Sequence, residues 1–140
     1  MTVMPRITRL LETALYVEDL AHSAGFYDEV LGLARLFGDA RLIAFDVPGG
    51  SVLLLFRRGT TLATAHLPGG TIPPHDGGGP VHLAFAVEAG ELAAWEARLS
   101  EHGVPIEGRT AWPRGGTSVY FRDRDGHLLE LATPGLWATY

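Results

Sequence analysis

Polar and apolar positions alternate in the same way in two distant segments of the chain. Glu12 opens the apolar run 13–17, His82 opens the apolar run 83–87, and an acidic turn follows each run. Residues at even spacing on a strand share a face, so each polar opener points the same way as the small or medium side chains two and four positions on. The pattern predicts two equivalent strands and therefore an internal duplication.

The duplication continues into a helix after each strand. Apolar residues recur near the helical period from Asp19 to Gly32, and again from Glu91 to His102, which Gly103 follows. Glycine directly after the last periodic residue is a common helix C-cap. Short apolar runs between glycines come next, at 42–45 and 52–56 in the first copy and at 118–121 and 128–131 in the second. Each copy therefore predicts a strand, a helix, and then two or three strands.

A single carboxylate interrupts the last apolar run of the second copy. When the last runs are aligned on the glycine before each, Leu54 falls opposite Glu130, so the copies differ chemically at this position. A carboxylate is costly to bury unless it is paired or binds a metal. Glu12 and His82 are also polar side chains in apolar strands. We expect the side chains of Glu12, His82 and Glu130 to converge on one cation, which would compensate the cost of burying them.

Four segments carry a family resemblance: 15–20, 26–33, 82–85 and 120–130, the last reading Tyr-Phe-Arg-Asp-Arg-Asp-Gly-His-Leu-Leu-Glu. In this order they resemble the vicinal oxygen chelate superfamily, which includes glyoxalase I, fosfomycin-resistance thiol transferases, bleomycin-resistance proteins and extradiol dioxygenases. The resemblance implies an α+β fold of two βαβββ modules that form a curved mixed sheet around a metal or ligand cavity, usually as a homodimer. His82 and Glu130 fall on usual metal ligands, and Glu12 falls where histidine is commonest.

The implied ligand set of Glu12, His82 and Glu130 holds one divalent metal ion per chain. Two carboxylates and a neutral imidazole cancel the charge of that ion, which makes it a milder Lewis acid than three histidines would. Mn²⁺ and Mg²⁺ suit an oxygen-rich set, while Zn²⁺, Ni²⁺ and Co²⁺ remain open. Replacement of the usual histidine by Glu12 is equally compatible with loss of the metal.

Further candidates for the site lie near these ligands. Ser118 and Tyr120 occupy alternate positions of one predicted strand, so their side chains share a face. Tyr120 matches a position that contributes a hydroxyl in the fosfomycin enzymes, and it is predicted to be catalytic together with Glu12. Ser118, Trp112 and Arg122 are predicted to bind substrate, although a core or interface role for the tryptophan and a solvated position for the arginine remain open.

Composition excludes several kinds of chemistry. The 140 residues contain no Cys, Lys, Asn or Gln, so a thiolate nucleophile, a disulfide and a Schiff-base lysine are all impossible. The net charge of −5 disfavours binding to nucleic acid. No apolar stretch is long enough to span a membrane, and the first residues lack the apolar core of a secretory signal, so we expect a cytoplasmic protein.

The chain is predicted to be a single domain over residues 1–140, with module one at about 8–57, a linker at 58–80 and module two at 81–134. The linker is rich in Gly, Thr and Pro, and it is long enough to frame a pocket. His75 lies in it, either as an acid/base group, an extra ligand or a loop histidine without a role. The tail from Pro134 is unusually apolar and is expected to pack over a pocket or a subunit interface.

Three functions are compatible with the sequence. The leading one is a metal-dependent enzyme of lyase, isomerase or transferase type, in which the metal chelates neighbouring oxygens of a small molecule. The second is a metal-free protein that sequesters an amphiphilic compound, as bleomycin-resistance members do. An extradiol dioxygenase comes third, because non-haem iron oxygenases generally use two histidines and one carboxylate.

Overall fold

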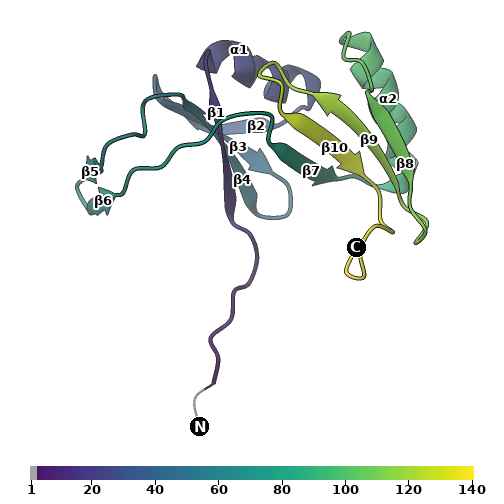
Figure 1. Cartoon of the computed structure of the whole chain (residues 1–140), viewed down its shortest axis with the longest axis horizontal. Helices are drawn as coiled ribbons and strands as arrows, with labels where there is room; N and C mark the ends of the chain where they lie inside the picture. Colours follow the sequence, from purple (N-terminus) through teal and green to yellow (C-terminus); the bar gives the residue numbers. More distant parts are fainter. Residues whose placement is uncertain (1–2) are drawn as a thin grey trace. The chain divides into compact units, whose positions relative to one another are not determined.

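The computed structural model describes residues 3–140, which form two compact units. Unit 1 comprises the residues up to Leu20 together with Leu33–Asp76, and unit 2 comprises Ala21–Gly32 together with Gly77–Tyr140. The helical segment that follows the first strand in sequence therefore belongs to the unit that contains the second sheet. Figure 1 traces the chain through both units.

Unit 1 is built on a four-stranded sheet, which we call sheet 1. Its strands are β1 (Glu12–Val17), β2 (Ala34–Gly38), β3 (Leu42–Val47) and β4 (Ser51–Arg57), in the order β1-β4-β3-β2. β1 pairs with β4 in parallel, and the other pairs are antiparallel. A small hairpin of β5 (Ala65–Leu67) and β6 (Gly70–Ile72) completes the unit (Figure 1).

Unit 2 repeats this order in sheet 2, where β7 (His82–Ala86), β10 (Leu128–Ala132), β9 (Thr117–Arg122) and β8 (Gly108–Ala111) are neighbours in that sequence. Its helical elements are α1 (Leu20–Gly25), which starts one residue before the unit, the π-helical turn η1 (Phe26–Val30), the short η2 (Ala89–Glu91) and α2 (Leu92–Glu101). Together the elements confirm the predicted α+β class, with three strands after each helix.

The strand registers confirm the alignment of the two copies. In sheet 1, Glu12 lies opposite Val52 and Ala14 lies opposite Leu54. In sheet 2, His82 lies opposite Leu128 and Ala84 lies opposite Glu130. Glu12 and His82 are therefore equivalent positions, and so are Leu54 and Glu130.

Each sheet has one buried apolar face. The buried side chains of this face come from alternate positions of β1, β3 and β4 in sheet 1 and of β9 and β10 in sheet 2: Leu15, Val17, Ile43, Phe45, Leu53 and Leu55, and Val119, Phe121, Leu129 and Leu131. In unit 2 the helical segment packs on this face, where the rings of Phe26 and Phe121 lie 6.3 Å apart. α2 is tied to the same segment because Arg98 Nε donates to the carbonyl of Val30 at 2.6 Å. We call the opposite face of each sheet its open face.

Three local features differ from the sequence prediction. The first helix widens into a π-helical turn from Phe26 before Gly32 ends it at φ +72°, and the predicted linker contains the β5–β6 hairpin. The tail is anchored because Tyr140 Oη donates to the carbonyl of Ala132 at 2.7 Å, while Trp137 stays 72% exposed.

No helix within residues 3–140 has the length and apolar character needed to cross a membrane.

Candidate functional site

The open face of sheet 2 gathers four of the predicted site residues. Glu130 on β10 lies opposite Tyr120 on β9, and the side chains of His82 and Ser118 reach it from the two flanking strands. Alternation places all four on the face opposite the apolar core. Ser118 and Tyr120 therefore share a face, as their alternate positions predict.

Glu130 is held as a buried carboxylate. Glu130 is only 5% exposed, although it lies in an otherwise apolar strand. Its Oε2 accepts a hydrogen bond from Ser118 Oγ, which in turn accepts one from Trp112 Nε1 at 2.8 Å. This relay satisfies one carboxylate oxygen and fixes the orientation of the group. The second oxygen, Oε1, faces His82.

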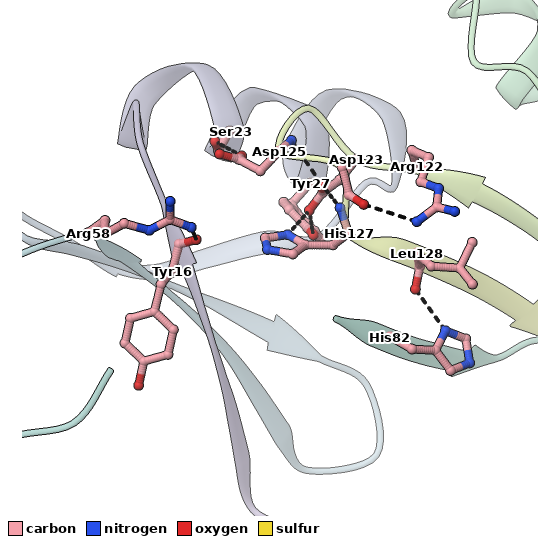
Figure 2. A network of polar contacts seen from close by, with 11 residues as sticks. Tyr16, Ser23, Tyr27, Arg58, His82, Arg122, Asp123, Asp125, His127 and Leu128 are labelled. Atoms are coloured by element: carbon pink, nitrogen blue, oxygen red, sulfur yellow. Dashed lines mark hydrogen bonds and ion pairs between the residues drawn. The ribbon is translucent and has the colours of Figure 1, made fainter. Parts of the chain in front are cut away.

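The imidazole of His82 has a defined tautomer. Its Nδ1 lies 2.8 Å from the carbonyl oxygen of Leu128, which can only accept, so Nδ1 carries a proton (Figure 2). In the neutral ring Nε2 then bears a lone pair, and it points at Glu130 Oε1 at 3.1 Å. Two lone pairs repel at this distance unless a proton or a metal cation lies between them. A histidine that donates one N–H to a backbone carbonyl and offers the other nitrogen is the usual arrangement of a metal ligand.

The other predicted residues of this face take different positions. The ring of Tyr120 lies 6.2 Å from that of His82, and its hydroxyl has no hydrogen-bond partner within residues 3–140. Trp112 contributes its indole N–H to the relay on Glu130. Arg122 is engaged by the carboxylate of Glu107 at 3.1 Å and by the carbonyl of Gly126 at 3.2 Å, so its guanidinium already has two partners.

Glu12 lies in unit 1, where it lines a cavity of about 570 Å³ on the open face of sheet 1. No cluster of three or more potential metal-binding side chains forms within residues 3–140. His82 and Glu130 lie within hydrogen-bond distance of each other in unit 2, and the predicted ligand set of Glu12, His82 and Glu130 stays a prediction.

His75 also lines the cavity of unit 1, together with Leu67 and Ile72 from the hairpin, as expected for a linker that frames a pocket. Its Nδ1 lies 2.5 Å from the hydroxyl of Tyr16. Burial and the charge of Asp76 raise the pKa of Tyr16, which keeps this hydroxyl protonated. We assign the bond as Oη donating to Nδ1, which leaves the imidazole proton on Nε2.

A buried polar network around Asp123 was not assigned a role from the sequence, although Asp123 and His127 belong to its most specific motif. Asp123 Oδ2 accepts hydrogen bonds from Tyr27 Oη at 2.5 Å and from His127 Nδ1 at 2.7 Å (Figure 2). Its Oδ1 accepts the backbone N–H groups of Asp125 and His127. The network closes the turn between β9 and β10 and ties it to the helical segment. These motif residues are structural, while the last motif residue, Glu130, belongs to the site.

Tyr27 should give this network a signature at alkaline pH. Burial first, and then the charge of Asp123, raise the pKa of Tyr27 far above its ordinary range. Above about pH 10 the unfolded chain loses the phenolic proton and the folded chain keeps it, so stability falls as pH rises, by about 1.4 kcal/mol per pH unit. In Tyr27→Phe this contribution is absent. The variant should be about 1–3 kcal/mol less stable at pH 8, with a difference that shrinks towards pH 11.

Urea unfolding of both proteins between pH 8 and pH 11 measures this effect. Because Tyr16 and Tyr140 also have raised pKa values, the informative quantity is the difference between the two proteins. Parallel stability profiles would show that the Tyr27 hydroxyl titrates normally and does not donate to Asp123.

Comparison with known proteins places this site in context. Residues 9–131 match the family model described as the glyoxalase/bleomycin resistance protein/dioxygenase superfamily. The chain is 30% identical over 118 residues to the metallothiol transferase FosB of Bacillus licheniformis, an alignment that covers 84% of this chain and 70% of that protein. A shorter alignment of 51 residues, 39% identical, relates it to the fosfomycin resistance protein FosX of Listeria innocua and covers 36% of this chain and 38% of that protein.

Among solved structures, the lactoylglutathione lyase of Agrobacterium tumefaciens is similar to the whole fold. The TM-score is 0.85 at 32% sequence identity, and the match covers 95% of this chain and 98% of that protein. The predicted fold type of two βαβββ modules is thereby confirmed.

Proposed function

Because the chain belongs to the glyoxalase/bleomycin resistance protein/dioxygenase superfamily, we propose that it is a metal-dependent enzyme that acts on a small oxygenated molecule. The observation that carries the proposal is the close approach of His82 Nε2 to Glu130 Oε1 at 3.1 Å, with the imidazole oriented by the contact of its Nδ1 with the carbonyl of Leu128. A divalent cation could take the place of the proton that otherwise joins these two atoms. His82 Nε2 and Glu130 Oε1 are the atoms that would hold it.

A divalent ion at this position supplies Lewis acidity that polarises a bound oxygen. The residues around this position orient the metal ligands and the substrate. Trp112 and Ser118 hold one oxygen of Glu130, so that the other oxygen keeps a fixed direction. Tyr120, with an unpartnered hydroxyl above the same face, is placed to donate a proton to a developing negative charge on the substrate. Ser118, predicted to bind substrate, serves here as a positioning residue.

Of the three reaction types open from the sequence, group transfer has the most support. A relative that aligns with most of this chain is named a metallothiol transferase. The chain contains no Cys, so a thiol would have to enter as a co-substrate and not as part of the protein. The lyase alternative draws support from the structural match to a lactoylglutathione lyase. Leu54, at the position equivalent to Glu130, cannot bind a metal ion, so the first module has no counterpart of the Glu130 carboxylate.

The second candidate function is metal-free binding of an amphiphilic compound. The cavity of unit 1 favours it, because most of the residues that line it are apolar or aromatic. It requires no ion at His82 and Glu130, so metal content separates the two candidates.

Elemental analysis of protein purified without chelator or metal resin, followed by calorimetric titration of Mn²⁺, Ni²⁺ and Zn²⁺ into stripped protein, tests the proposal. We expect about one ion per chain. Absence of metal together with absence of titration heat would reject the enzyme and leave the binding protein.

The contribution of Glu12 can be tested in the same titration. Replacement of Glu12 by His should be tolerated and should shift the preference from Mn²⁺ towards Zn²⁺, because imidazole is a softer ligand than carboxylate. An unchanged order of affinities would show that Glu12 does not bind the ion, and would leave His82 and Glu130 as the protein ligands.

A homodimer in the cytoplasm completes the proposal. Residues 3–11 expose several large apolar side chains, among them Val3, Ile7 and Leu10 at 85%, 93% and 75% exposure. Such a run is unusual on a monomer surface and favours a protein partner.

A further inference from the structure

The cavity of unit 1 has an apolar floor with a polar group at each end. The floor is formed by side chains of β1, β3 and β4 on the open face of sheet 1, namely Ala14, Leu42, Leu54 and Phe56. The volume of about 570 Å³ lies within the usual range for pockets that enclose a small organic molecule. Three charged residues line the cavity: Glu12, Asp39 and Arg41.

Strand register places Glu12 and Arg41 at opposite ends of the cavity. Glu12 opens β1, whereas Arg41 precedes Leu42, which lies opposite Phe56, and Phe56 in turn lies opposite Tyr16. The two positions are thus separated by about 15 Å along the strands and by two strand spacings, about 10 Å, across them. An anionic group near Arg41 would therefore escape repulsion from the carboxylate of Glu12. The Asp39 carboxylate lies at the Arg41 end, where its Oδ1 already accepts two backbone N–H groups.

Arg41 is a buried donor without an acceptor. Its Nε is shielded from solvent and has no hydrogen-bond partner within residues 3–140. Its guanidinium carbon lies over the ring of Phe56, 5.5 Å from the ring centroid, which orients the group. The turn before β3 is also fixed, because the backbone N–H groups of Arg41 and Leu42 both donate to Asp39 Oδ1. An unsatisfied buried donor is costly, and an acceptor atom of a ligand at Arg41 would relieve that cost.

His75 adds a second donor at the same end. Its ring meets the ring of Phe56 edge-on at a centroid distance of 4.9 Å, and the hydroxyl of Tyr16 occupies its Nδ1. The remaining N–H on Nε2 belongs to a side chain that lines the cavity. Two N–H donors from Arg41 and His75 therefore flank the Phe56 ring.

We infer that this cavity binds an elongated organic acid, with its acidic group at Arg41 and His75 and its apolar body on Leu42, Leu54 and Phe56. Binding of the acid does not depend on the proposed function. Only the further step, that the bound acid is a substrate, rests on the proposed enzyme activity. The far end of such a molecule points to Glu12. A short acid without an apolar body would leave most of the cavity unfilled.

Calorimetric titration of metal-stripped, full-length protein with 6-phenylhexanoate, 3-phenylpropanoate and the neutral 6-phenylhexan-1-ol tests the inference. We expect the long acid to bind about tenfold to a hundredfold more tightly than the alcohol, the range for one hydrogen bond to a charged group. The short acid should bind more weakly than the long one. Equal affinity for the acid and the alcohol, or no binding by any of them, would overturn the inference.

Arg41→Gln should remove the preference for the acid and leave the affinity for the alcohol within about threefold. Arg35→Gln is the matched control, because the Arg35 guanidinium carbon also lies over a phenylalanine ring, 5.9 Å from the centroid of Phe45, but this residue does not line the cavity. A preference that survives in Arg41→Gln, or is lost equally in Arg35→Gln, contradicts the assignment.

The NMR signal of the Arg41 Nε–H in the unaltered protein gives an answer that does not depend on the folding of a variant. It should shift on addition of the long acid and remain in place with the alcohol, and an unmoved signal at saturating acid would reject Arg41 as the anchor. Because the protein is metal-free in these experiments, failure of metal binding and failure of acid binding are separate results.

Discussion

Asp123→Ala should lower the free energy of unfolding by about 3–5 kcal/mol, because one unsatisfied buried donor costs about 1–3 kcal/mol and several lose their acceptor at once. The side chains of Asp123 and His127 are 1% and 2% exposed. The substitution leaves the Tyr27 hydroxyl, the His127 N–H and two backbone N–H groups without their acceptor. Since a domain of this size is stabilised by about 5–15 kcal/mol, the loss should be obvious in urea or thermal unfolding.

Two further variants make this experiment specific. Asp123→Asn keeps one oxygen for the two backbone N–H groups and should fall between the wild type and the alanine variant. Asp46→Ala removes an exposed carboxylate from sheet 1 and should change stability by less than about 0.5 kcal/mol. If Asp123→Ala resembles Asp46→Ala, the network does not stabilise the fold and the motif needs another explanation.

The same network shows why part of the site could be predicted and part could not. The motif identified Asp123 and His127 as distinctive, but a sequence pattern does not separate a residue that holds a turn from one that binds a ligand. Glu130 could be identified because a carboxylate inside an apolar strand needs a partner. The internal duplication then located His82, because equivalent strands carry equivalent openings, and the registers of both sheets agree with that alignment.

The tautomer of His82 depends on a contact that no sequence pattern contains. Its Nδ1 proton is fixed by a backbone carbonyl of the neighbouring strand, and every residue offers such a carbonyl. Arg41 was missed for a similar reason, because its importance comes from a buried Nε that lacks an acceptor and not from its residue type. Arg122 was predicted to bind substrate, but Glu107, distant in sequence, already pairs with it.

Secondary structure was also predictable only where the signal in the sequence is local. Strands with clear alternation and the glycine stops at Gly32 and Gly103 were predicted correctly, since these signals are local, and both glycines have positive φ. The β5–β6 hairpin has only three residues in each strand, in a segment rich in glycine and proline, so composition favoured a loop. Its importance lies in the cavity, which Leu67 and Ile72 help to enclose.

Glu130→Ala should lower the affinity for Mn²⁺, Ni²⁺ or Zn²⁺ at least tenfold, and His82→Ala should have an effect of the same order. Each variant removes one of the two facing lone pairs, and mutation of even an outer-shell partner typically costs tenfold to a hundredfold. Ser118→Ala should cause a smaller loss within that range, because it frees Glu130 Oε2 and leaves the indole of Trp112 without its acceptor. Calorimetric titration of each stripped protein measures these differences.

Glu88→Ala provides the matched control for this series. Glu88 follows β7 in the same unit and is exposed, so its removal changes the net charge by the same amount as Glu130→Ala without altering the facing pair. If metal affinity depended on the overall negative charge, both variants would weaken binding equally. If it depends on the geometry of His82 and Glu130, Glu88→Ala should bind like the wild type. Equal titrations of Glu130→Ala and Glu88→Ala would therefore remove the metal site from the proposed enzyme, while a metal-free binding function for the cavity of unit 1 would survive.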